Sequence, residues 1–452
     1  VKAYLGYESE NTFGTLSGTI LRSHHSVLIE DKEYVLSVVA EELLVICLKT
    51  KNILFKLRPG QKCVAQITAV ETDKSNFVYV GYSDGTIRVF NLENRSLMSE
   101  INNESKSISI LKHVELMSIN LLVVVSLDNK VNVYDREIAE TVFTFDNHTS
   151  TIIEVLHIGK NKIITVCKDG LIRTWCLVKG VLLQIVSIGK SEITNSSVFT
   201  LDDKNKYLMI TAQDEDILFF SLEEQGNVYQ DKSFIFKRNS FKKVIQVLIL
   251  SSKMFGLVEE SGLFELYSID NVMESKKRYK RKEKREVKNL TDIETFVMSP
   301  ANRINLICKH RLDDKSYRVA LTLKCTSGFL SLNSYNEINE WRIIEGENNS
   351  TVISQVNISS QEGHRFPTNC LLLSSDDSLC VSTSVECLNI WSVVNCSRVK
   401  SIETTNISAI DFLPKDHSAI SKSNCSPART LLWLHIGQVT RQNLSLRPYL
   451  WG

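Results

Sequence analysis

The sequence predicts an all-β protein built as a β-propeller, and three observations lead to this prediction. Short apolar runs rich in β-branched residues occur in pairs, each pair separated by a tight-turn dipeptide. The pairs recur at a near-constant spacing along most of the chain. With 43% hydrophobic and 23% charged residues, the chain has the composition of an ordinary globular protein and can bury a large core.

The turn inside each pair marks the repeat. The first clear copy runs from Phe77 to Phe90, and successive turn markers at positions 85, 129, 170, 215 and 262 lie 44, 41, 45 and 47 residues apart. Degenerate copies with turns near positions 41–42 and 327–328 bring the expected number of units to seven. Asp-Gly and Asp-Asn favour hairpins because primed turns need residues that tolerate positive φ. The turn aspartates are Asp84, Asp128, Asp169 and Asp214.

This period matches one propeller blade, since four strands take about 40–45 residues. A single blade cannot bury both of its faces, and a closed ring of blades removes the exposed strand edges. A helical solenoid of similar period is disfavoured because i, i+3, i+4 apolar spacing is scarce. We therefore expect a seven-bladed propeller over residues 1–340, the first blade of a second propeller over 341–418, and a tail without blade pattern over 419–452.

A histidine precedes a tryptophan by 27 residues at two places in the chain. In WD repeats, a histidine, a serine or threonine, a turn aspartate and a tryptophan form a buried hydrogen-bonded chain, which fixes one packing arrangement when every member is paired. We expect a structural role of this kind and no catalytic one. The residues are His148, Thr165, Asp169 and Trp175 in one blade, and His364 and Trp391 in another.

A basic insertion interrupts the repeat, since the marker step from 262 to 328 is 66 residues. Clustered cations of this kind are typical of a nuclear-localisation signal or a patch that binds RNA phosphates. An ordinary solvated insertion is the alternative, and without an aromatic series no base-specific reading is expected. The basic residues are Lys276, Lys277, Arg278, Lys280, Arg281, Lys282, Lys284, Arg285 and Lys288.

Motifs for catalysis are missing from the sequence. It has no G-x-x-x-x-G-K-[ST], H-E-x-x-H or G-x-S-x-G motif, and its 11 scattered cysteines include no C-x-x-C pair. The net charge of +1 predicts no global attraction to nucleic acid or membranes. We expect no enzyme activity, cofactor, metal site, small-molecule substrate or membrane association. A propeller enzyme with titratable groups in its axial channel is the alternative.

Several segments, taken in order, resemble the WD repeat-containing protein 3 family, also called U3 small nucleolar RNA-associated protein 12. The resemblance spans roughly residues 1–418, and the placement of the basic run is its most specific part. The matching segments are Val1–Tyr7 with Phe13-Gly14, Val80–Phe90, Leu263–Tyr267 followed by the basic run, Gly363–Arg365, Ser374–Asp376 and Leu388–Trp391.

This resemblance implies a non-catalytic scaffold of the nucleus and nucleolus that works in ribosome biogenesis. Members of the family belong to the UTP-B part of the small-subunit processome and bind the U3 small nucleolar ribonucleoprotein and pre-ribosomal RNA during 18S rRNA maturation. The expected partners are therefore other UTP-B proteins, U3 small nucleolar RNA and pre-rRNA. A cytoplasmic WD-repeat adaptor in trafficking or cytoskeletal assembly is the rival interpretation.

The chain departs from this family at its C-terminal end. Members have two complete propellers and a helical C-terminal domain, whereas the sequence shows the pattern of only one blade of a second propeller. We expect the tail over 419–452 to reflect an incomplete or mis-spliced transcript.

Overall fold

The computed structural model describes most of residues 24–434, with short gaps and a longer one over 278–299. Nearly all of the described secondary structure is strand, which confirms the all-β prediction. The strands form four-stranded antiparallel sheets, each built from four consecutive strands in chain order, and a last sheet of three strands. Among the described residues, no helix has the length and apolar character needed to cross a membrane.

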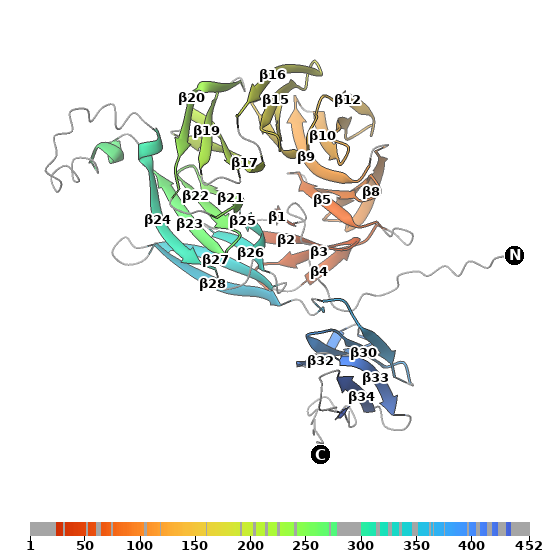
Figure 1. The fold of residues 1–452 in the computed structure, drawn as a ribbon. Helices are drawn as coiled ribbons and strands as arrows, with labels where there is room; N and C mark the ends of the chain where they lie inside the picture. Colours follow the sequence, from red (N-terminus) through yellow and green to blue (C-terminus); the bar gives the residue numbers. More distant parts are fainter. Residues whose placement is uncertain are drawn as a thin grey trace. The chain divides into compact units, whose positions relative to one another are not determined.

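Each sheet is made of strands that are consecutive in the sequence, and the sheets succeed one another in chain order (Figure 1). The first four consist of β1–β4 (His24–Ile29, Lys32–Val39, Glu42–Cys47, Ile53–Leu57), β5–β8 (Ile67–Thr72, Phe77–Tyr82, Thr86–Asn91, Ser96–Asn102), β9–β12 (Ile108–Leu116, Ile119–Ser126, Val131–Asp135, Thr141–Phe145) and β13–β16 (Ile152–Ile158, Lys162–Cys167, Leu171–Cys176, Val181–Ser187). The next three consist of β17–β20 (Ile193–Leu201, Asn205–Ala212, Ile217–Leu222, Val228–Phe236), β21–β24 (Val244–Ser251, Met254–Glu259, Leu263–Ile269, Ile304–Arg311) and β25–β28 (Tyr317–Thr322, Gly328–Asn333, Glu337–Glu345, Thr351–Ser360). The last two consist of β29–β32 (Cys370–Leu373, Leu379–Thr383, Cys387–Ser392, Ser397–Glu403) and β33–β35 (Ile407–Leu413, Ser418–Ser423, Leu431–Leu434). A short 3-10 helix, η1 (Pro300–Arg303), precedes β24.

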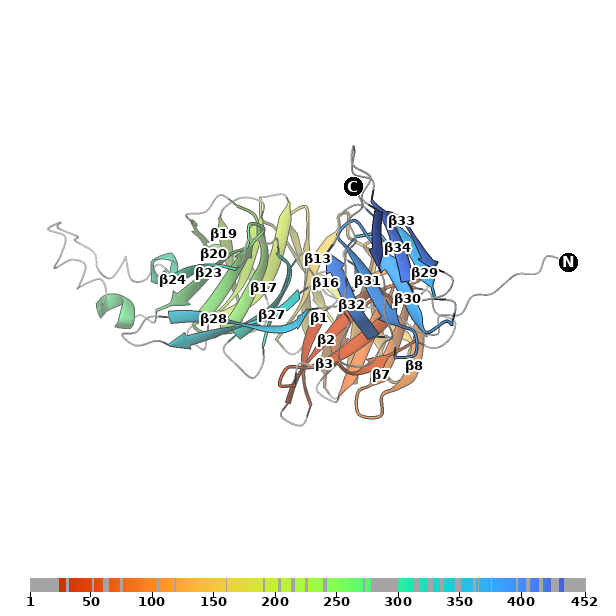
Figure 2. The same ribbon diagram turned by 90° about the horizontal axis from the view of Figure 1, so that it is seen from below.

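Neighbouring sheets pack face to face and share apolar cores, as in a propeller. The first strands β5, β9, β13, β17, β21 and β25 each lie against the first strand of the next or preceding sheet, and β1 lies against both β5 and β25. Each pair of successive sheets from β1 to β28 encloses its own apolar cluster. A further cluster joins the first and seventh sheets through Val35, Leu44 and Ile46 on one side and Leu330 and Leu332 on the other. Figure 2 shows the same series of sheets from below.

The hairpins between second and third strands form at the turn markers near 41–42 and at 85, 129, 170 and 262, but with a different turn at the last four. The marker at 327–328 is misplaced, because Gly328 begins β26, the second strand of its sheet, and position 215 lies outside the described residues. In the β6–β7 hairpin, the Gly85 amide donates to the Tyr82 carbonyl at 3.1 Å, and Gly85 alone of the loop has a positive φ, of 88°. The Asp84 carboxylate accepts from the Thr86 amide at 2.9 Å. Asn129, Gly170 and Gly262 repeat this arrangement. A four-residue turn that ends in one left-handed residue corresponds to a three-residue hairpin loop with a bulge, so the expectation of primed turns is wrong.

Two compact units divide the chain, residues 18–359 in one and residues 1–17 with 360–452 in the other. The seventh sheet extends through β28 to Ser360, beyond the boundary expected at residue 340. Within the tail for which no blade pattern is expected, β34 and β35 pair with each other in the last, three-stranded sheet. Neither strand is flagged by an Asp-Gly turn, because the connection over residues 424–430 is longer than a tight turn.

Candidate interaction site

The basic insertion is a long connection between β23 and β24 of the sixth sheet (Figure 1). The two strands stay paired from Leu263 opposite Arg311 to Ile269 opposite Ile304. At the base of the insertion the Asp270 amide donates to the Arg303 carbonyl at 2.9 Å, and Arg303 Nε donates to the Asp270 carbonyl at 2.8 Å. The closed base allows a long insertion at little cost to the sheet, because loop-closure entropy grows slowly with length.

Only the first two basic residues of the insertion belong to the described part of the chain. Residues 273–277 form one helical turn, in which the Lys276 side chain is half-buried and that of Lys277 is exposed. The remaining members of the expected patch lie outside the described residues, namely Arg278, Lys280, Arg281, Lys282, Lys284, Arg285 and Lys288. Asp214 lies outside them as well.

A buried polar network links the second and third strands of the fourth sheet to the connection that enters it. Thr165 Oγ1 lies 2.9 Å from His148 Nε2 and accepts from Trp175 Nε1 at 3.1 Å. Asp169, expected as the fourth member, instead accepts from the Leu171 amide at 3.1 Å and from the Thr149 hydroxyl at 3.4 Å. Burial lowers the pKa of His148 to about 4, so its imidazole is neutral near pH 7.

Other sheets place different side chains in the same position. In the eighth sheet, Ser382 Oγ lies 2.7 Å from His364 Nε2 and accepts from Trp391 Nε1 at 2.7 Å. In the third sheet, Asn103 takes the place of the histidine, donating to Ser126 Oγ at 2.9 Å and accepting from the Tyr134 hydroxyl at 2.7 Å. The histidine–tryptophan pattern does not identify the network of the third sheet. The sequence feature that does is an aromatic residue five positions after the left-handed turn residue, here Tyr134 after Asn129.

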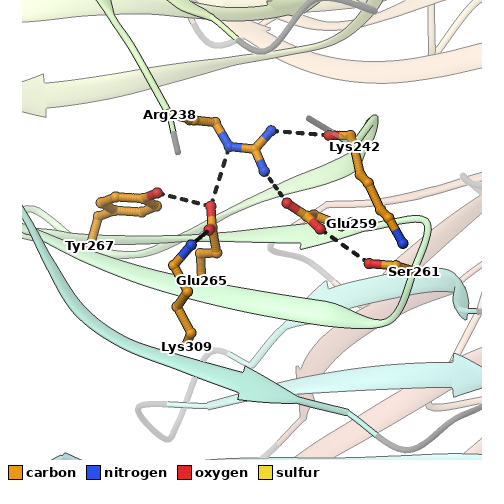
Figure 3. Close-up of polar contacts among 7 residues, drawn as sticks. All are labelled: Arg238, Lys242, Glu259, Ser261, Glu265, Tyr267 and Lys309. Atoms are coloured by element: carbon orange, nitrogen blue, oxygen red, sulfur yellow. Dashed lines mark hydrogen bonds and ion pairs between the residues drawn. The ribbon is translucent and has the colours of Figure 1, made fainter. Parts of the chain in front are cut away.

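The sixth sheet uses charged groups at this position, as Figure 3 shows. Arg238, in the connection that enters β21, has a fully buried side chain. Its Nε donates to Glu265 on β23 at 3.2 Å, and a second guanidinium nitrogen donates to Glu259 on β22. A third interaction joins the guanidinium to the Lys242 carbonyl at 3.3 Å. One buried arginine therefore ties the entering connection to two strands of the sheet.

Further groups complete the pairing of the two carboxylates (Figure 3). Glu265 accepts from the Tyr267 hydroxyl at 2.8 Å and pairs with Lys309 Nζ on β24 at 2.6 Å. Glu259 accepts from the Ser261 hydroxyl at 3.1 Å. Burial works to raise the pKa of Glu265, but hydrogen bonds from Lys309 and Tyr267 and the charge of Arg238 outweigh it and the pKa is lowered. Burial and the neighbouring Glu265 raise the pKa of the Tyr267 phenol.

This cluster balances two cations against two carboxylates within the sixth sheet. Glu265 and Lys309 lie opposite each other on β23 and β24, the two strands that the insertion connects. Buried charges persist only where they are paired and hydrogen-bonded, and each of these four groups has such partners. We refer to Arg238, Glu259, Glu265, Tyr267 and Lys309 as the sixth-sheet charge cluster. Its members tie the connection before β21 to strands β22, β23 and β24.

Together these features define an all-β protein of propeller-like sheet architecture, with a polar network in several sheets and a basic insertion on a closed base. No protein-family model matches the chain, and no curated protein is significantly similar to it in sequence.

Proposed function

We propose that the chain is a non-catalytic WD-repeat scaffold whose first seven sheets close into a propeller. The observation that carries this proposal is the apolar cluster shared by the first and seventh sheets, which parallels the clusters between all other successive sheets. A ring closed in this way leaves no open sheet face in the first unit and presents loops on two rims as attachment surfaces. Such a surface suits a protein that holds several partners.

Closure can be tested by removing the seventh sheet. In a closed ring, deletion of residues 313–359 exposes Val35, Leu44 and Ile46, so the amides of β2 and β3 should lose protection from hydrogen exchange although they are distant in sequence. Deletion of residues 435–452 serves as the control, since β2 and β3 should keep their protection. Unchanged protection of β2 and β3 after the first deletion would contradict a closed ring.

We further propose that this scaffold acts in the nucleolus, as a UTP-B component of the small-subunit processome that binds U3 small nucleolar ribonucleoprotein and pre-rRNA for 18S rRNA maturation. The order of the repeats and the position of the basic run support this proposal through their resemblance to the WD repeat-containing protein 3 family. The closed base at Asp270 and Arg303 adds support, because it attaches both ends of the basic insertion to one sheet. Other UTP-B proteins would dock on the loops of the ring.

The basic segment can be tested by crosslinking the purified full chain to RNA at a series of salt concentrations. Replacement of the nine cations from Lys276 to Lys288 by glutamine should reduce crosslinking and its salt dependence, because each cation that contacts a phosphate releases counterions. A variant with the same composition in scrambled order is the matched control, and it should retain crosslinking if charge alone is needed. Unchanged crosslinking in the glutamine variant would contradict RNA binding by this segment.

The location of the tagged chain separates the nucleolar proposal from the rival adaptor. Nucleolar accumulation together with co-purified U3 RNA is the expected result. A cytoplasmic distribution without U3 RNA would contradict the nucleolar proposal and favour an adaptor in trafficking or cytoskeletal assembly.

A further inference from the structure

A histidine, a glutamate and a cysteine converge at one point of the eighth sheet. The ligand-type atoms of His364, Glu386 and Cys387 all lie within 4.8 Å of one another. His364 Nδ1 lies 3.4 Å from Cys387 Sγ. His364 comes from the connection that enters β29, whereas Glu386 and Cys387 come from the turn and the start of β31. The fold thus brings together donors from separate parts of the sequence.

The equivalent positions of the fourth sheet carry no such donors. Counting back from the tryptophan, Cys387 stands four residues before Trp391, where Leu171 stands before Trp175. Glu386 occupies the position of the left-handed Gly170. Two metal-ligating residues therefore replace a leucine and a glycine at one corner of an otherwise similar network, and that network does not require either of them.

The distance between nitrogen and sulfur fits a tetrahedral zinc ion. Bond lengths of about 2.0–2.1 Å to imidazole and about 2.3 Å to thiolate, at a tetrahedral angle, place the two donors about 3.5 Å apart. The structure has 3.4 Å between His364 Nδ1 and Cys387 Sγ. A hydrogen bond between the Cys387 thiol and the imidazole would have the same length, and titration with zinc distinguishes that hydrogen bond from a metal site.

The second ring nitrogen of His364, Nε2, contacts an outer hydrogen-bond partner, as is usual for histidines that bind a metal. His364 Nε2 lies 2.7 Å from Ser382 Oγ, which is itself fixed by the Trp391 indole at 2.7 Å. Histidine ligands usually donate their second ring N–H to such an outer partner, and this sets the tautomer and the ring orientation. With Nε2 donating to Ser382, Nδ1 keeps its lone pair, 3.4 Å from Cys387 Sγ and 3.5 Å from the Asn389 amide nitrogen.

We propose that His364 Nδ1, Cys387 Sγ and a Glu386 carboxylate oxygen bind one zinc ion. Imidazole, thiolate and carboxylate together suit zinc, and three protein ligands leave the fourth position for water or a partner's side chain. On binding, the Cys387 thiol releases its proton to solvent and bonds as thiolate. Such a site was not expected from the cysteine spacing, because 23 residues separate His364 from Cys387.

The test uses the full chain freed of metal by a chelator. Titration with zinc against a chromophoric chelator should show one equivalent bound, and cobalt(II) should give a thiolate-to-metal charge-transfer band. Cys387→Ser should abolish that band and weaken zinc binding at least tenfold, whereas Cys370→Ser, the matched control in the same sheet, should change neither. Removal of the outer partner in Ser382→Ala should weaken binding about 10–100-fold.

A second measurement needs no variant and guards against misfolding. Zinc should slow maleimide alkylation of Cys387 relative to the half-buried Cys370 within the same molecule, measured by mass spectrometry. The proposal is overturned if no stoichiometric zinc binds, if folded Cys387→Ser binds zinc as the parent chain does, or if zinc leaves the relative alkylation of Cys387 unchanged.

Discussion

Replacement of Arg238 by methionine should strongly destabilise the first unit. The guanidinium is fully buried and ties Glu259 and Glu265 to the connection before β21. Methionine keeps most of the apolar stem but removes the charge. Glu259 would then keep the Ser261 hydroxyl, and Glu265 would keep Lys309 and Tyr267, but the cation between the two carboxylates would be gone.

The magnitude follows from the burial of the charges that remain. Breaking a buried ion pair by removal of one partner costs about 3–5 kcal/mol, because the other charge stays desolvated. Lys309 partly compensates Glu265, so we expect about 3 kcal/mol for the arginine substitution. The deficit should shrink as the pH falls through the range in which Glu265 titrates. The Arg238 charge helps to lower the pKa of Glu265, so without it Glu265 takes up a proton more readily in the folded variant than in the parent chain.

The control is the same substitution at an arginine whose own side chain is exposed. Arg58 is 48% exposed and lies 2.6 Å from Glu42, which also pairs with Lys56 at 3.5 Å. The Arg58 charge is itself largely solvated, and the buried Glu42 keeps Lys56, so Arg58→Met should cost clearly less than Arg238→Met. Urea unfolding followed by circular dichroism gives the change in the free energy of unfolding, and hydrogen exchange in β22 and β23 localises it. Equal costs for the two substitutions would refute the reasoning.

Three further predictions concern the fourth sheet and its contact with the third. Thr165→Val removes the hydroxyl shared by His148 and Trp175 and should cost about 2–4 kcal/mol in urea unfolding, since two buried polar groups lose their partner. The pKa of His148 is lowered from 6.5 to about 4 in the folded chain, so the free energy of unfolding should be unaffected by this group above pH 6.5. As the pH falls from 6.5 towards 4, protonation of the unfolded chain should lower the free energy of unfolding by about 3 kcal/mol. A His148→Gln variant should lack this loss. Gly180→Ala should lower the melting temperature, because Gly180 has a φ of 65° and a Cβ there would lie 2.3 Å from a Phe143 ring atom.

The sequence predicts the hairpins well because their signal is local. Asp84 and Gly85 hold adjacent positions, and the same few residues both make the turn and mark it in the sequence. The turn geometry was predicted less well, since a left-handed glycine occurs in primed turns and in bulged loops alike. The strands β34 and β35 carry no such local signal, because a long connection and not a tight turn joins them.

The sixth-sheet charge cluster could not be predicted in this way. Arg238 and Glu265 are 27 residues apart and lie in a stretch of sequence with many other charges. Their burial and their ion pair become visible only in the folded sheet, because most charged residues in such a sequence are solvated. The proposed zinc ligands pose the same difficulty, because neither His364 nor Cys387 belongs to a short metal-binding motif.

The polar networks explain how the architecture can persist while the sequence pattern fades. Each network joins the connection that enters a sheet to the second and third strands of that sheet, and it does so with His148 and Trp175, Asn103 and Tyr134, or Arg238 and Tyr267. The shared requirement is that every buried polar group finds a partner, and this fixes geometry more strictly than residue type. A sheet can therefore exchange histidine for asparagine or arginine as long as the partners change with it. The residue type at these network positions therefore predicts such a fold poorly. A left-handed turn residue followed five positions later by an aromatic residue predicts it better.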